Sequence, residues 1–393
     1  MAVSRGFALP GTTRLWTLPR SIQLDWAYAA ADKRDLRLDL LRGFAVFVMV
    51  VDHFGGASWL YYITGNNSFF VSGAEAFVFI SGLVVGMVYG GVALRQGLRA
   101  AQTKALERAW TLYKLTVVLT LLFGTVSLFL GLPWASELRI TNPITFVIDV
   151  VTLHQTFYLS DVMLMYAFLM AMAAGALWLL IKNRTAWLLA ASSAAWLAFQ
   201  LFRVELPWQI SGNDTFNLAA WQLLFFGGMA IGYHRDALTA RLSGVPRGVY
   251  LLLSATLLVW LVQVCGTHGA LLNRWISSAE ADALMQTLFV KSALAPGRLV
   301  ASFIVFQFAY LAATLFWKPI WAALGWLLMP LGQNALYAYT MHVGIVGLAR
   351  AALLYLPGNL AMVGTINTSL QLLAILAIWV MIRRQFLFKI VPR

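Results

Sequence analysis

The chain has 393 residues, of which 61% are hydrophobic and only 11% are charged. Soluble globular proteins carry about 45–50% apolar and about 25% charged residues, so this composition excludes a soluble enzyme, a disordered chain and a secreted disulfide scaffold. The single Cys265 excludes a disulfide framework and a cysteine-based metal site. The net charge of +13 does not by itself indicate a nucleic-acid partner, because in a membrane protein the placement of charge matters more than its sum. The sequence predicts an all-α integral membrane protein.

Long apolar segments recur along the whole chain. A helix needs roughly 17–25 mostly apolar residues to cross a bilayer, and on this basis we expect about ten transmembrane helices in one bundle. The segments cover residues 38–54, 69–94, 109–132, 158–181, 187–202, 215–233, 249–265, 298–316, 335–356 and 367–382. The segment 187–202 is only just long enough to span.

Basic residues are unequally divided between the two sides of these segments. Most of the 28 Lys and Arg residues precede the first segment, follow the last, or lie in loops on that same side. The opposite side carries Arg139, Arg203, Arg274, Lys291 and Arg298. The positive-inside rule then places both termini in the cytoplasm. We expect a cytoplasmic arm over 1–37, a transmembrane domain over 38–382 and a basic cytoplasmic tail over 383–393.

The first segment carries three polar side chains on one helical face. Arg42 and His53 are 11 positions apart, which leaves them about 20° apart around a helix and roughly 16 Å apart along its axis. Asp39 lies one turn before Arg42, where the two can form an ion pair. Ionisable groups in a span are costly and are functional candidates by default. The alternative is a structural Asp39–Arg42 pair with an interfacial histidine.

Four further polar residues from separate segments map to the outer half with His53: Glu75, Asp161, Gln222 and Arg298. A carboxylate beside an imidazole orients it and stabilises its charged form. Such a carboxylate can also be a helix cap or an interfacial group. We expect Glu75 or Asp161 to act with His53, and Gln222 and Arg298 to shape a substrate site.

The inner half contains Arg42 and the amides Gln333 and Asn334, which follow Gly332. Asn334 is a candidate substrate-binding residue, although small residues beside amides also suit tight helix packing. His342 lies midway along its segment and is the second choice for a catalytic base. The scattered histidines, and the absence of an HExxH sequence or a phosphate-binding glycine loop, predict no metal site.

The Arg42-x10-His53 pattern resembles the signature of transmembrane acyltransferases, as does Gly73-Ala-Glu75-Ala-Phe-Val-Phe-Ile-Ser81-Gly82. More closely, the chain resembles the OpgC family. The matching pieces are Arg37-Leu-Asp39-Leu-Leu-Arg42-Gly43, Asp52-His53, Asp161 to Tyr166, Phe216-Asn217, Trp221-Gln222-Leu-Leu-Phe-Phe-Gly227, Lys291, Leu294-Ala-Pro-Gly-Arg298 and Leu331-Gly332-Gln333-Asn334-Ala-Leu-Tyr337.

This resemblance implies transfer of an acyl group, succinyl in the namesake, to a hydroxyl of a periplasmic glucan. The implied protein is a multi-pass enzyme of a bacterial inner membrane. Its expected partners are acyl-CoA as donor, an envelope glycan as acceptor, and membrane lipids. Arg42 would hold a donor phosphate and His53 would act as general base. The main alternative is a secondary transporter in which buried histidines and carboxylates relay protons.

The charge distribution yields a test of topology. In a variant without Cys265, single cysteines added within 357–366 should react with an impermeant reagent from outside the cell. Cysteines added within 235–247 should react only after permeabilisation, because the basic loops stay inside. The reverse pattern would contradict the predicted orientation.

Overall fold

The computed structural model describes residues 26–29, 34–65, 70–131, 140, 142–157, 159–265, 274–354 and 364–392. Throughout these residues every regular element is helical, apart from one isolated bridge between Gln155 and Ser211. The prediction of an all-α fold is therefore confirmed.

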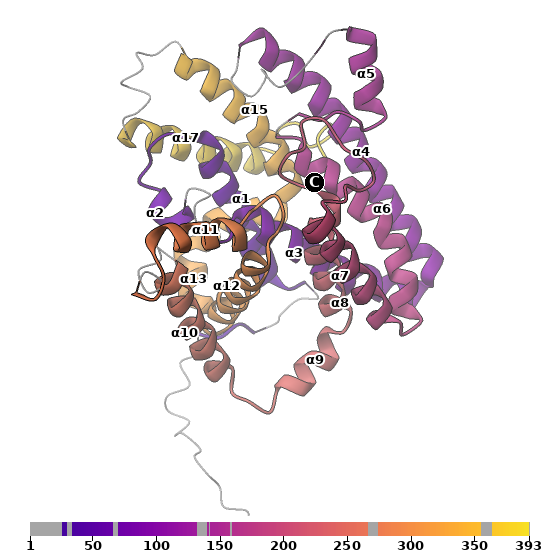
Figure 1. The fold of residues 1–393 in the computed structure, drawn as a ribbon, viewed down its shortest axis with the longest axis vertical. Coiled ribbons are helices and arrows are strands. Elements are labelled where there is room, and N and C mark those ends of the chain that lie inside the picture. Colours follow the sequence, from indigo (N-terminus) through magenta and orange to yellow (C-terminus); the bar gives the residue numbers. More distant parts are fainter. Residues whose placement is uncertain are drawn as a thin grey trace, which may run out of the picture.

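Each predicted segment contains one long helix. These helices are α1 (Leu36–Phe54), α3 (Gly73–Gln96), α4 (Leu98–Phe129), α6 (Asp161–Ile181), α7 (Thr185–Phe202), α8 (Leu218–Tyr233), α10 (Arg247–Cys265), α12 (Pro296–Leu315), α15 (Ala335–Leu354) and α17 (Gly364–Arg383). Shorter elements are α2 (Tyr61–Thr64), α5 (Pro143–Val151), α9 (Arg235–Leu242), α11 (Ser278–Leu288), α13 (Trp317–Ile320), the π-helix η5 (Trp321–Gly325) and α14 (Trp326–Gln333). Figure 1 shows α1 and α3 near the centre, with α4 and α6 side by side along one edge.

Six of the described helices are long and apolar enough to cross a membrane, namely α3, α4, α6, α7, α12 and α17. Helices α9 and α10, bent by 96° at a short break, add a seventh if they count as one span. This finding supports a multi-pass membrane protein. The total of about ten spans and the cytoplasmic position of both termini stay predictions.

Helix α4 is longer than predicted. It begins at Leu98 rather than near residue 109, so Arg99, Lys104 and Arg108 lie on a helix and not in a loop. Gly97, with φ +92°, separates α4 from α3. The sequence did not predict the first turns of α4 as part of a span, because these turns carry charged residues and a span is recognised by its apolar residues.

The segment 317–333, which lies between the predicted spans 298–316 and 335–356, is helical. It forms α13, η5 and α14, although Pro319, Gly325 and Pro330 are signals of broken helices. Tertiary packing overrides these signals, because α14 lies against α1. A Cβ at Gly43 would overlap the carbonyl of Leu328, so glycine is what permits this contact.

Helices α3 and α8 pack in the same way, through glycines spaced four residues apart on each helix. A Cβ at any of four positions would overlap the backbone of the opposite helix: Gly82, Gly86, Gly228 and Gly232. This small-xxx-small pattern brings helix backbones close where apolar burial alone gives no driving force in lipid. It fixes α3, which carries Glu75, against α8.

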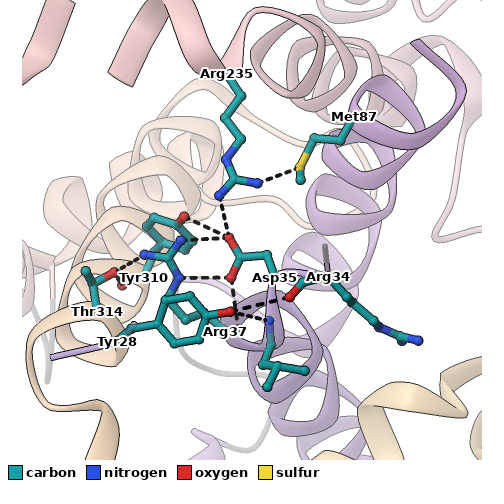
Figure 2. A network of polar contacts seen from close by, with 9 residues as sticks. Tyr28, Arg34, Asp35, Arg37, Met87, Arg235, Tyr310 and Thr314 are labelled. Carbon is teal, nitrogen blue, oxygen red and sulfur yellow. Dashed lines mark hydrogen bonds and ion pairs between the residues drawn. The ribbon is translucent and has the colours of Figure 1, made fainter. Parts of the chain in front are cut away.

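A buried carboxylate at the start of α1 joins three parts of the chain (Figure 2). The side chain of Asp35 caps α1 by accepting a hydrogen bond from the backbone N–H of Arg37 at 3.1 Å. It also pairs with the Arg37 guanidinium at 2.7 Å and with Arg235 of α9 at 2.9 Å. The hydroxyl of Tyr310 on α12 donates to the same carboxylate at 3.2 Å. Burial acts to raise the pKa of Asp35, but the two guanidiniums hold it below its ordinary value.

The described part of the predicted N-terminal arm contacts the bundle. The Arg37 guanidinium lies 4.4 Å from the ring centroids of both Tyr28 and Tyr310, as a cation between two aromatic faces. The backbone N–H of Tyr28 donates to the carbonyl of Thr314, and that of Lys318 donates to the carbonyl of Trp26. Residues 1–25 and 30–33 of the arm lie outside the described residues.

Candidate active site

Two histidines from distant parts of the sequence meet inside the bundle. Nδ1 of His53, near the end of α1, lies 2.8 Å from Nε2 of His342 on α15. The rings are stacked with centroids 5.0 Å apart. His342 is fully buried, and its Nδ1 lies 2.6 Å from the backbone carbonyl of Tyr339. Sequence reasoning treated the two histidines as competing candidates, whereas the fold makes them a pair.

The hydrogen bonds fix the tautomer of a neutral pair. A carbonyl only accepts, so Nδ1 of His342 carries the proton that it donates to Tyr339. Nε2 of His342 is then an acceptor, and Nδ1 of His53 must donate to it. The remaining ring nitrogen of His53, Nε2, therefore carries a lone pair. A histidine oriented through Nδ1 with a basic Nε2 is the arrangement that general-base catalysis requires.

A small cavity lies beside His53. It is lined by Met49, Asp52, His53, Ser72, Gly73, Ala74, Val162, Phe216 and Lys291. Asp52, 7% exposed, accepts a hydrogen bond from the Thr64 hydroxyl at 2.6 Å. The lining of the cavity thus includes residues that carry an imidazole, a carboxylate and an ammonium group.

Lys291 also lines this cavity, and the sequence analysis gave it no catalytic or binding role. Burial lowers the pKa of its ammonium, while the carboxylates of Glu75, Asp161 and Asp52 act in the opposite direction. Its ammonium lies 6.0 Å from the ring centroid of Phe216. Lys291 lies in the connection between α11 and α12, which the sequence assigned to the outer side. This shared side with His53 was the signal in the sequence that could have indicated a role for Lys291.

Glu75 and Arg298, both predicted on the outer side, form a buried ion pair with each other. Glu75 is 0% exposed and Arg298 is 3% exposed. The Arg298 Nε–H donates to one carboxylate oxygen of Glu75, while the backbone and hydroxyl of Ser72 donate to the other oxygen at 2.9 and 2.5 Å. Ser72 and Glu75 form the capping box of α3. The hydrogen bonds of Glu75 thus go to a helix cap and an arginine, and none of them reaches His53.

Asp161 and Gln222 are also buried, but their hydrogen bonds go to other residues than His53. Oδ1 of Asp161, at the first position of α6, accepts from the backbone N–H of Val162 at 2.7 Å. Gln222 on α8 exchanges hydrogen bonds with Ser192 on α7, accepting from its hydroxyl at 2.6 Å and donating to its carbonyl at 2.7 Å. Gln222 therefore links two helices, and the structure does not direct its amide into the cavity beside His53.

A second cavity, of about 280 Å³, lies between α1, α3, α4 and α6 at the Arg42 end of α1, and we call it the inner cavity after the predicted orientation. Its polar lining consists of Arg42, Ser81, Tyr89, Arg108, Tyr166 and Gln333. Arg42 lies 3.7 Å from Asp39, whose closer partner is Arg34 at 2.5 Å. Within the described residues, the buried Nε of Arg42 has no hydrogen-bond partner. An arginine with an unused donor beside a second arginine suits an anionic ligand.

Asn334 lies at the break between α14 and α15. Its side-chain amide donates to the backbone carbonyl of Pro330 at 3.0 Å. The backbone carbonyl of Asn334 accepts from the backbone N–H of Ala338 at 2.8 Å. This is a capping role, and Gln333 rather than Asn334 lines the inner cavity.

Aromatic side chains separate the inner cavity from the histidine pair. Phe77 lines the cavity and packs edge-on against Tyr166, with centroids 5.4 Å apart. The ring of Tyr339 lies 6.4 Å from Phe77 and 4.6 Å from His342. Ring contacts thus connect the wall of this cavity to His342 through Phe77 and Tyr339.

The comparisons with known proteins give one result. The family described as OpgC protein matches residues 34–387, nearly the whole chain. No curated protein matches the chain, and no solved structure matches it.

The buried pair of Glu75 and Arg298 yields a test that separates a structural from a catalytic role. We expect Glu75→Gln to lower thermal stability in detergent, because removing one partner of a buried pair costs about 3–5 kcal/mol. The double variant Glu75→Gln/Arg298→Met should recover part of the loss. A Glu75→Gln protein with unchanged stability but no activity would instead support the predicted catalytic role of Glu75.

Proposed function

Because the chain belongs to the OpgC family, we propose that it is an integral membrane O-acyltransferase that moves an acyl group, succinyl or acetyl-like, from cytoplasmic acyl-CoA to a hydroxyl of a periplasmic glycan. Membership of the family implies acyltransferase-type activity, and the apolar helices support a multi-pass membrane protein. A bacterial inner membrane is the location that fits both substrates. The observation that carries the proposal is the His53–His342 pair, with its basic nitrogen at His53.

The inner cavity supports the assignment of the donor. Coenzyme A carries phosphates, and Arg42 and Arg108 bring two guanidiniums to one cavity in the half of the bundle assigned to the cytoplasmic side. Arg42 and His53 are separated by roughly 16 Å along α1. The phosphates can therefore stay at the inner cavity while the thioester extends past Phe77 toward the histidines.

The proposed reaction begins when Nε2 of His53 removes the proton from an acceptor hydroxyl. The acceptor oxygen then forms a bond with the thioester carbonyl carbon. As the carbon–sulfur bond breaks, the CoA thiolate leaves and takes the proton back from His53. The positive charge of Lys291, in the same cavity as His53, favours the negative charge that develops on the carbonyl oxygen.

His342 acts on the reaction through His53. By accepting a hydrogen bond from the Nδ1–H of His53, it holds the imidazole in the tautomer that leaves Nε2 basic. It is thus a positioning residue. Because its role is indirect, we expect the loss of His342 to lower acyl transfer less than the loss of His53. Asp161 contributes through its electrostatic attraction to Lys291.

We predict that His53→Ala lowers acyl transfer by about 10²–10⁴-fold, because a positioned base contributes that much to proton transfer. His342→Leu should lower kcat by about 10–100-fold, the usual effect of losing a group that orients a histidine. His342→Gln should retain more activity than His342→Leu, because the amide oxygen accepts from His53. The measurement is transfer of labelled acyl from acyl-CoA to envelope glycans by purified, monodisperse protein.

The outcomes separate the alternatives. Binding of acyl-CoA should survive in all three histidine variants, which serves as the control for folding. Normal turnover in His53→Ala with loss in His342→Leu would move the base to α15. Normal turnover in both would exclude histidine catalysis and favour the transporter.

A further inference from the structure

A third cavity lies between α1, α3, α8 and α12 and has a volume of about 370 Å³. We call it the apolar slot, because its lining is almost entirely apolar and includes Leu41, Phe44, Val48, Ile80, Leu224 and Phe303. Leu41, Phe44 and Val48 belong to a different face of α1 from the one that carries Arg42 and His53. The slot is therefore separate from the inner cavity that contains the arginines.

Gly227 on α8 forms part of the slot wall, and helix packing does not explain why it is glycine. A Cβ at Gly227 would have no atom within 4 Å, whereas a Cβ at the next residue, Gly228, would overlap the carbonyl of Phe79. Glycine is less favourable than alanine inside a helix. A side chain at position 227 would therefore extend into open space at the slot wall, without meeting the backbone of the opposite helix.

The slot is long enough to hold an alkyl chain. Its lining on α12 runs from Leu299 to Ala309, which is about 15 Å of helix. This is half of the roughly 30 Å hydrocarbon core. Phe303 and Phe44, at 54% and 39% exposed, lie on the lipid-facing side of the slot.

The slot ends next to the proposed catalytic base. Ser72 and Gly73 line both the slot and the small cavity that contains His53. A molecule with its alkyl chain in the slot would place the polar group at the head of that chain beside His53. The donor is excluded as this occupant, because the arginines that suit its phosphates line the other cavity.

We propose that the apolar slot binds one alkyl chain of a lipid-anchored acceptor, so that the hydroxyl of this acceptor reaches His53. The inference rests on the proposed function and specifies its acceptor as a lipid-linked glycan. Binding of the alkyl chain would hold the acceptor hydroxyl close to His53, because a binding contact away from the reacting atoms can orient them.

The test compares two acceptors that differ only in the chain, dodecyl β-glucoside and methyl β-glucoside, with the full-length protein in nanodiscs. The wild-type protein should use the dodecyl compound with a KM at least about tenfold lower, the effect of burying roughly two methylene groups. Gly227→Leu fills the slot and should remove this preference. Gly175→Leu is the matched control, because Gly175 is also helical and a Cβ there has no atom within 4 Å.

A second readout does not depend on turnover. Dodecyl glucoside with a diazirine at the end of its chain should label peptides of α1, α3, α8 or α12 in wild type, Gly175→Leu and His53→Ala, but not in Gly227→Leu. Labelling that Gly227→Leu leaves unchanged, or equal KM values for both glucosides in wild type, would overturn the inference. If no protein transfers acyl to either glucoside, the proposed function fails, and the labelling alone decides whether the slot binds an alkyl chain.

Discussion

The hydrogen bond between His53 and His342 is the contact on which the proposed chemistry depends. It joins positions that are 289 residues apart, so it exists only if α1 and α15 keep their relative position. The surrounding structure holds the outer end of α1 from several directions. Arg350 of α15 donates to the carbonyl of His53 at 3.2 Å, and Asn367 of α17 donates to the carbonyls of Gly55 and Ala57 at 2.5 and 2.8 Å. The inner end of α1 is held by the Asp35 network (Figure 2).

Helix α1 also divides the space around it by chemical character. One face carries Arg42 toward the inner polar cavity and His53 toward the outer one. Another face lines the apolar slot. In the proposed reaction, this division would keep a charged donor and a lipid-anchored acceptor on different faces of α1, with both ending near His53. The close glycine contacts of α3 with α8 and of α1 with α14 fix the walls of these cavities, because packed backbones leave little room for movement.

Apolar length predicted the ten long helices named above within the described residues, because a span must be apolar over a fixed length. Local signals failed where packing decides the structure, as in segment 317–333, whose prolines did not prevent a helix against α1. In the site, the face shared by Arg42 and His53 followed from helix geometry. The partner of His53 did not, because nothing in the sequence states which helices are neighbours. For the same reason, the sequence could name only Glu75 or Asp161 as the acidic partner of His53 and did not indicate the ion pair between Glu75 and Arg298.

The central claim is that acyl groups pass from a donor on one side of the membrane to an acceptor on the other through His53. The most direct measurement is transfer in sealed proteoliposomes of known orientation, with labelled acyl-CoA on one side and an impermeant glycan on the other. The account predicts product only when acyl-CoA is on the side of the C-terminal tail, and none with His53→Ala. Product formed only when donor and acceptor share one side, or equal product from His53→Ala, would contradict it.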